Sequence, residues 1–224
     1  MNFEYYKYTM PETIKNKSTR ALKILNKLSN EYPDAGCHLE YDNPFELLIS
    51  TLLAAQCTDE RVNAVMVLLF KKYKTPADFL KFTQAELEHE LRSINFYRNK
   101  SKNVLSCCAS LVNDHNGEVP KTMDELTKLA GVGRKTANVV LGNCFGEPTI
   151  MTDTHLNRVS QRLCLTDNDK PEKIEMELRE IIPDKLQVKY SHVIGQHGRS
   201  NCKAKKPLCG ECVVCELCPS CNKI

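Results

Sequence analysis

The stretch that decides the fold is Leu129-Ala130-Gly131-Val132-Gly133-Arg134-Lys135-Thr136-Ala137-Asn138-Val139-Val140. It is predicted to form a tight turn between two helices, with two glycines in the turn and Lys135 in the first turn of the second helix. Glycine permits a positive φ angle and the close approach of another backbone. The amide groups at a helix start lack acceptors within the helix, and the helix dipole favours an anion there. The turn is therefore a candidate phosphate site, and an ordinary turn between packed helices is the alternative.

Lys135 is the residue that an ordinary turn does not explain. The helix dipole disfavours a cation in the first turn of a helix. Lys135 is thus electrostatically misplaced unless an anionic partner or a chemical role keeps it there.

Composition limits the class of protein. The 224 residues are 42% hydrophobic, which is enough for a real core, and the net charge of +3 permits nucleic-acid binding without arguing for it. No apolar run reaches membrane-spanning length, and the N-terminus lacks the basic start and apolar middle of a signal peptide. We therefore expect an intracellular protein of the cytoplasm or nucleoid, or of the nucleus if the source is eukaryotic.

The hydrophobic pattern is helical almost throughout. Residues 1–17 are expected to form an irregular arm, and no convincing alternating strand follows. Apolar residues at helical spacing recur in the segments 18–28, 45–56, 62–73, 104–112, 135–145, 156–163, 174–182 and 186–197. The sequence therefore predicts an all-α protein.

Six of the twelve cysteines fall within the last 23 residues. Four of them have the spacing C-x6-C-x2-C-x5-C, namely Cys202, Cys209, Cys212 and Cys218. In a reducing compartment, clustered cysteines usually bind metal. Four thiolates suit structural zinc and a [4Fe–4S] cluster equally, and spacing alone does not choose between them. It also does not exclude Cys215 and Cys221 as ligands.

Taken together, these motifs resemble the endonuclease III family of the helix–hairpin–helix DNA glycosylases. The resemblance runs from about Pro44 to Cys218. It is carried by four motifs in order: residues 129–140, Asp153-Thr154-His155 with Arg158-Val159, His197-Gly198-Arg199, and the cysteine tail.

The resemblance implies an all-helical fold of two lobes with a DNA-binding cleft between them. One lobe, residues 37–147, would be a six-helix domain that carries the helix–hairpin–helix motif. The other would combine residues 1–36 with 148–224. It would hold a [4Fe–4S] cluster through Cys202, Cys209, Cys212 and Cys218, leaving Cys215 and Cys221 as spare thiols or alternative ligands. The expected partner is double-stranded DNA with damaged bases or abasic sites, bound by a monomer.

The resemblance also implies that Lys135 is the nucleophile and Asp153 its essential carboxylate. An amine that attacks C1′ of a flipped-out nucleotide displaces the base, and the resulting Schiff base permits β-elimination of the 3′ phosphate. The attacking amine must be neutral, so burial, the helix start and the neighbouring Arg134 are expected to lower its pKa. Considered alone, Asp153 is a helix N-cap, and both roles are compatible. His155 is expected to be structural.

Flipping a base leaves a gap in the duplex, which enzymes of this kind fill with side chains. Gln56 matches the family's intercalating glutamine, and Phe96 stands where the family has a wedging leucine. Asn95 replaces the glycine that usually precedes the wedge. The expected contacts to the DNA backbone come from Gly131, Val132, Gly133, Arg134 and Thr136 in the hairpin, and from Arg199 beside the basic residues Lys203, Lys205 and Lys206. The alternative for this basic patch is a solvated charge run.

Three functions are compatible with these features. The first, which we predict, is a bifunctional glycosylase and abasic-site lyase that removes oxidised pyrimidines. The second is a monofunctional mismatch or adenine glycosylase, which the lysine at position 135 disfavours. The third is a non-catalytic helix–hairpin–helix protein with a structural metal, which the pairing of Lys135 with Asp153 disfavours.

Overall fold

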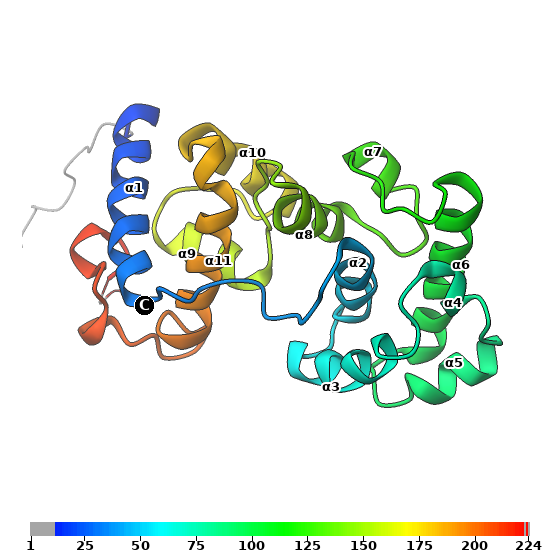
Figure 1. Ribbon diagram of the computed structural model, residues 1–224. Helices are drawn as coiled ribbons and strands as arrows, with labels where there is room; N and C mark the ends of the chain where they lie inside the picture. Colours follow the sequence, from blue (N-terminus) through cyan, green and yellow to red (C-terminus); the bar gives the residue numbers. More distant parts are fainter. Residues whose placement is uncertain (1–11, 222, 224) are drawn as a thin grey trace, which may run out of the picture. The chain divides into compact units, whose positions relative to one another are not determined.

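The computed structural model describes residues 12–221 and residue 223 (Figure 1). All regular structure in this part of the chain is helical, which confirms the predicted all-α class. The α-helices are α1 (Ile14–Glu31), α2 (Pro44–Leu53), α3 (Asp59–Phe70), α4 (Pro76–Phe79), α5 (Gln84–Glu90), α6 (Tyr97–Asp114), α7 (Met123–Leu126), α8 (Arg134–Phe145), α9 (Thr154–Arg162), α10 (Pro171–Ile181) and α11 (Asp184–Ser200). Two short 3-10 turns follow, η1 (Cys209–Glu211) and η2 (Cys215–Leu217).

Two helix boundaries differ from the sequence expectation. The first helix begins at Ile14 rather than Ser18, because the Thr13 hydroxyl accepts a hydrogen bond from the Asn16 amide and so caps it. The remainder of the predicted arm, residues 1–11, lies outside the described residues. The predicted helix over 45–56 ends at Leu53, and Gln56 adopts a left-handed φ of 54°.

The chain divides into two compact units. The hairpin unit comprises residues 36–151, and the discontinuous unit joins residues up to 35 with residues from 152 onward. The sequence expectation places the divisions at 36/37 and 147/148, one residue later and four residues earlier in the chain than these. The chain therefore leaves the discontinuous unit after α1 and returns to it just before α9.

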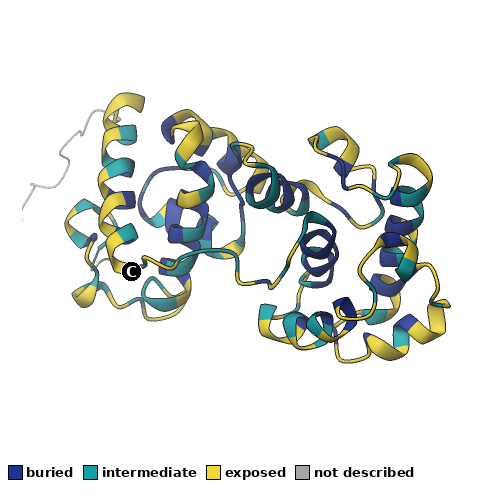
Figure 2. Ribbon diagram, in the orientation of Figure 1, coloured by how far each residue is buried: buried dark blue, intermediate teal, exposed yellow. Residues whose placement is uncertain are grey.

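The hairpin unit is held together by an apolar core. Phe79 lies at its centre, with its ring centroid 5.5 Å from Phe45 and 6.0 Å from Phe70. Helix α8 packs on α2 and α7, and its residues Ala137, Val140 and Leu141 are buried in the same core. Figure 2 shows α2 almost entirely in the colour of buried residues. The core thereby fixes the direction in which α8 begins.

The discontinuous unit is organised by the close packing of α9 and α11, with α1 against α10 and α11. A Cβ atom on Gly198 would lie 2.9 Å from Cβ of His155, so only glycine permits this approach. Arg20 of α1 donates to the carbonyl of Leu163 at 2.6 Å, just after the end of α9. In the described part of the chain, none of the helices combines the length and apolar character that a membrane crossing requires.

Candidate functional site

The turn between α7 and α8 is shaped by one positive φ and one internal hydrogen bond. Gly131 has φ of 76°, and the amide of Val132 donates to the carbonyl of Leu129 at 3.1 Å. The Val132 side chain is buried in the core of the hairpin unit. Val132 therefore anchors the turn from inside, and its own amide is already used.

The two glycines of the turn serve different purposes. A Cβ on Gly131 would lie 2.8 Å from Nδ2 of Asn103 on α6, so this glycine allows the turn to pack on its own unit. Gly133 has an ordinary extended backbone, and nothing lies within 4 Å of the place that its Cβ would occupy. The space beside Gly133 is thus open to an external molecule.

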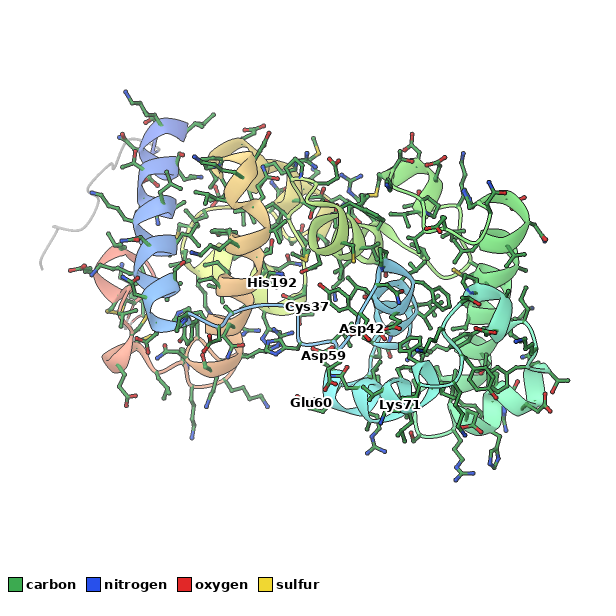
Figure 3. All side chains as sticks on the ribbon, in the orientation of Figure 1. Cys37, Asp42, Asp59, Glu60, Lys71 and His192 are labelled. Carbon is green, nitrogen blue, oxygen red and sulfur yellow. A yellow bond between two sulfur atoms is a disulfide. The ribbon has the colours of Figure 1, made fainter. Side chains whose placement is uncertain are left out.

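Helix α8 begins without a side-chain cap and with two cations. Gly133 is its N-cap residue and makes no side-chain hydrogen bond to the helix, while Arg134 and Lys135 occupy the first turn. Helix α3 has the usual arrangement, with Thr58 as a cap and the acidic residues Asp59 and Glu60, labelled in Figure 3, in the first turn. The start of α8 is therefore suited to an anion.

The exposure of the α8 start corrects one expectation. The sequence predicts that the Lys135 amine is buried, but Lys135 is exposed, as is Arg134, and only Thr136 is half-buried. The reason is that the buried apolar positions of α8 begin two residues after Lys135, at Ala137. The helix start and the neighbouring guanidinium are present as predicted.

Asp153 occupies the start of α9 and has two partners. Its Oδ1 accepts a hydrogen bond from the Leu156 amide at 2.7 Å, which makes it the N-cap of α9 as the sequence predicts. Its Oδ2 lies 3.8 Å from Nη2 of Arg199 on α11. The Asp153 side chain is 20% exposed, so the carboxylate remains accessible to a ligand. Lys135 belongs to the hairpin unit and Asp153 to the discontinuous unit, and their pairing stays a prediction.

The motif around His155 has a structural explanation. Nη2 of Arg158 donates to the Gly198 carbonyl at 2.7 Å and to the Cys202 carbonyl at 3.1 Å, and it lies 3.3 Å from Nδ1 of His155. These contacts join α9 to the end of α11 and to the cysteine tail. The side chain of Arg158 thus supports the tail, with His155 against its guanidinium.

The cysteine tail encloses a cavity in the discontinuous unit. The thiols of Cys202, Cys209, Cys212 and Cys218 are all free and all line it, together with Val159, Arg162, Leu163, His197, Asn201, Pro207, Val214 and Cys221. Within residues 12–221 and 223, no three His, Cys, Asp or Glu side chains converge closely enough to hold a single metal ion. The four predicted ligands nevertheless line one common cavity, which is the arrangement that a multi-atom cluster requires.

Cys215 and Cys221 form a disulfide with each other. The expectation that they are spare thiols or alternative ligands is therefore wrong for this structure. The pairing arises because both residues lie at the end of the tail, where successive turns bring their Cα atoms to 5.3 Å. It divides the six tail cysteines into one bonded pair and four free thiols.

Two further side chains border the cavity. Nη1 of Arg162 lies 3.4 Å from Sγ of Cys202 and also donates to the Lys203 carbonyl at 2.7 Å. His197 is buried between the hydroxyl of Tyr32 and the thiol of Cys212, and burial lowers the pKa of this imidazole to about 4. A neutral imidazole and a guanidinium therefore face the sulfur atoms.

Comparison with known proteins agrees with this combination of features. Residues 49–184 match the family described as HhH-GPD superfamily base excision DNA repair protein. Endonuclease III of a Synechocystis species is 47% identical over 206 residues, which cover 92% of this chain and 94% of that protein. The chain belongs to the endonuclease III family. Endonuclease III of Bacillus subtilis is 44% identical, covering 87% of this chain and 89% of that protein.

Solved structures of endonuclease III extend the likeness to the fold. A trapped endonuclease III–DNA covalent intermediate, described as an estranged-adenine complex, matches with a TM-score of 0.87 and 45% identity. The match covers 92% of this chain and 97% of that one. A thermostable thymine-DNA glycosylase, at 23% identity and a TM-score of 0.80, shares the fold.

Gln56 and Phe96, the wedge candidates of this endonuclease III family member, have a common backbone feature. Both are exposed, and both adopt a left-handed conformation, with φ of 54° and 58°. Phe96 is 64% exposed and is the N-cap residue of α6. Asn95, which stands in place of the family's glycine, donates through Nδ2 to the Gln56 carbonyl at 2.7 Å. The structure thus brings the two candidate segments together within the hairpin unit.

Sequence reasoning missed Lys100 and Arg162. The spacing of Arg158 and Arg162, four residues apart, places both on one side of α9 and could have indicated their shared task. Lys100 is 6% exposed in spite of its charge, and no local pattern distinguishes it from the exposed Lys102. Its role follows from contacts with residues far away in the sequence.

Proposed function

We propose that this chain is a DNA glycosylase with an associated abasic-site lyase activity, and that it removes oxidised pyrimidines from duplex DNA. The observation that carries the proposal is the exposed amine of Lys135 in the first turn of an uncapped helix, directly after a glycine turn. Membership of a base excision repair family supports it. An amine held beside a phosphate site is suited to attack the sugar of a nucleotide bound there.

The proposed reaction uses Lys135 as the nucleophile. Its nitrogen forms a bond to C1′ of a flipped-out nucleotide, and the bond from C1′ to the base breaks. The covalent product rearranges, with opening of the sugar ring, to a Schiff base between the lysine and C1′. Loss of a proton from C2′ then allows the 3′ phosphate to leave by β-elimination.

Asp153 is proposed to supply the negative charge that this reaction needs. While Oδ1 is held by the Leu156 amide, Oδ2 is directed to a guanidinium 3.8 Å away rather than to a tight hydrogen bond. Such a carboxylate can stabilise positive charge on the sugar or take a proton. In this arrangement Arg199 orients Asp153, in addition to its proposed phosphate contact.

The hairpin is proposed to bind the DNA backbone through its amides. Gly133 leaves open space for a phosphate, and the first turn of α8 offers amide donors to it. Gly131 and Val132 shape the turn from within, whereas Arg134 and Thr136 are the side chains placed to contact phosphates. Such contacts position the duplex and carry no base specificity.

The tail fits a [4Fe–4S] cluster. Four free thiols around one cavity are the donor set that such a cluster takes, and Cys202, Cys209, Cys212 and Cys218 would hold it. When bound, the cluster would supply four iron–sulfur bonds that cross-link the tail. The exposed residues Lys203, Lys205 and Lys206, in the loop between the first two ligands, would thereby be held for phosphate contact. We further propose that the protein acts as a monomer on DNA inside the cell.

Borohydride trapping on DNA with an abasic site tests the proposal. The wild-type protein is expected to form a covalent adduct, which should vanish in Lys135→Ala because no amine remains to form the Schiff base. Lys128→Ala removes another exposed lysine of the same unit and should trap normally. Excision of thymine glycol by the wild type without any adduct would show a monofunctional glycosylase instead. Neither excision nor adduct would leave a binding protein.

The metal proposal is tested by iron content and visible absorbance of the purified chain. Cys209→Ser should lose both, since it removes one of the four ligands. The double variant Cys215→Ser with Cys221→Ser should retain both, since neither residue is a proposed ligand. Zinc in place of iron, or loss of iron from the double variant, would contradict the assignment.

A further inference from the structure

Four consecutive carbonyl groups, from the last residue of α2 into the turn that follows it, all accept hydrogen bonds. Nζ of Lys100 donates to the carbonyls of Leu53 at 2.9 Å and Ala55 at 2.7 Å. The Cys57 amide donates to the Ala54 carbonyl at 3.1 Å, and Asn95 donates to the Gln56 carbonyl at 2.7 Å. The backbone of this turn is therefore held along its whole length, while the Gln56 side chain stays exposed.

Three of these four hydrogen bonds come from one short segment, residues 95–100. That segment also contains Phe96, so the turn that carries Gln56 and the turn that carries Phe96 are joined by side chains. Their partners are 39, 45 and 47 residues apart in the sequence. All of these residues belong to the hairpin unit.

Lys100 is a charged residue in a buried position, which is unusual for a contact that serves only to hold the fold together. Its side chain is buried, and desolvation lowers the pKa of its ammonium, with the nearby Cys57 opposing that shift. The ammonium lies at the C-terminus of α2, where the helix dipole favours a cation. Its burial is compensated by hydrogen bonds to the carbonyl of Leu53 at the end of α2 and to that of Ala55 just beyond the helix.

We propose that Lys100 and Asn95 are positioning residues that hold Gln56 and Phe96 as one preformed insertion unit for the gap left by a flipped nucleotide. This inference rests on the proposed function, in which Gln56 and Phe96 enter the duplex. Gln56 and Phe96 both have a left-handed backbone conformation, which residues other than glycine rarely adopt unless surrounding contacts stabilise it. Lys100 and Asn95 provide that hold, so the insertion unit is ordered before DNA binds.

Preorganisation should matter most when a paired base must be displaced. An intact damaged nucleotide has to lose its stacking and pairing, whereas an abasic nucleotide has no base to displace. Loosening the insertion unit should therefore slow base excision more than it slows trapping at a preformed abasic site. A general loss of folding would reduce both activities in parallel.

The test compares single-turnover excision of thymine glycol with borohydride trapping at an abasic site. Asn95→Ala is expected to slow excision about fivefold, the range for one lost hydrogen bond, and to change trapping less than twofold. Lys100→Met should slow excision further, and Lys100→Arg should restore part of the rate because it keeps a buried donor. Asn99→Ala and Lys102→Met, exposed neighbours on the same helix, serve as matched controls and should behave as wild type.

A second readout does not depend on catalysis. 2-Aminopurine placed opposite a tetrahydrofuran abasic analogue changes its fluorescence when side chains enter the gap. Asn95→Ala should reduce that fluorescence change when it is the only substitution. In a protein that already carries Gln56→Ala it should have no further effect, because the side chain that it positions is absent. This arm remains informative if the chain binds DNA without excising bases.

Several outcomes would overturn the inference. Equal losses of excision and trapping in Asn95→Ala would show that the contact only supports folding. Unchanged excision and fluorescence in both Asn95→Ala and a folded Lys100→Met would show that the contacts are unnecessary. If Lys100→Met unfolds at a lower temperature than wild type, the inference is tested with Lys100→Arg and Asn95→Ala instead. Asn95 is exposed, so Asn95→Ala should retain the fold.

Discussion

Helices α8 and α9 each carry a proposed catalytic residue near the N-terminus, yet they begin in opposite ways. Helix α9 is capped by Asp153, whose carboxylate satisfies the Leu156 amide. Helix α8 begins at Gly133 without a side-chain cap and has Arg134 and Lys135 in its first turn. A capped start is complete by itself, whereas an uncapped start with cations is suited to an external anion. This difference is the basis for proposing that α8 receives the DNA backbone and that α9 supplies a fixed negative charge.

The largest effect is expected from substitutions of Asp153 that separate its role as the N-cap of α9 from its negative charge. Asp153→Asn keeps a good N-cap and removes the charge, so excision and trapping should fall by at least about a hundredfold while the unfolding free energy changes little. Asp153→Ala removes the cap as well and should lower the unfolding free energy by about 1 kcal/mol. Urea denaturation and single-turnover kinetics on both variants measure the two effects.

The catalytic role proposed for Asp153 would be contradicted by one result of this comparison. If Asp153→Asn retains activity, the carboxylate serves only as the cap of α9. Another residue would then have to supply the negative charge that the proposed reaction needs.

An intermediate effect is expected when α8 is given the kind of start that α9 has. Gly133→Asp has room for its side chain, since nothing lies within 4 Å of a Cβ there, and it should cap the helix. The unfolding free energy should rise by a few tenths of a kcal/mol. DNA binding should weaken about tenfold, or roughly 1.4 kcal/mol, because a carboxylate would take the place of a phosphate.

Gly133→Ala is the matched control for this substitution. It adds a Cβ without a cap or a charge, and its affinity in a fluorescence anisotropy titration should exceed that of Gly133→Asp. Equal affinity of Gly133→Asp and wild type would show that no phosphate binds at the α8 start.

The smallest effect is expected at the start of α5, a helix that is capped by its own residues. In α5 the Thr83 amide and then the Thr83 hydroxyl donate to the Glu86 carboxylate, and together they hold the pKa of Glu86 below its usual value. A lowered carboxyl pKa stabilises the fold above the unfolded-state pKa, and that stability is lost as pH falls through the folded-state pKa. The stability difference between wild type and Glu86→Gln should therefore shrink from about pH 7 to about pH 3.

Thermal or urea unfolding at both pH values checks the Glu86 prediction, and DNA affinity near neutral pH should be the same in the two proteins. A difference that grows toward low pH would contradict the proposed direction of the pKa shift. Altered DNA binding would contradict the distinction between a self-capped start and the open start of α8.

Much of the fold was predictable because its signals are local. The caps at Asn43, Thr58, Thr83 and Asp153 each bond to an amide three residues further on, so a single short stretch encodes each helix start. The hairpin is local in the same sense, since Gly131 supplies the positive φ that its turn requires. The cysteine spacing likewise indicates a shared site, and the four thiols line one cavity.

The remaining features depend on residues that are far apart in the chain. The exposure of Lys135, the contact of Arg199 with Asp153 and the separation of the tail cysteines into a disulfide and four free thiols are not visible in any local pattern. Each depends on how helices pack, and packing is settled by the whole core rather than by neighbouring residues.

Lys100 illustrates the division between sequence and tertiary structure. By itself the sequence determined the helices, the hairpin and the types of side chain available for chemistry, because capping and turn preferences act over three or four residues. Only the tertiary structure decided that Lys100 is buried under the end of α2 and that Lys102, two residues away, is exposed. The physical reason is that burial of a charge is tolerated where distant carbonyls meet it, and those carbonyls reach Lys100 only after the chain has folded.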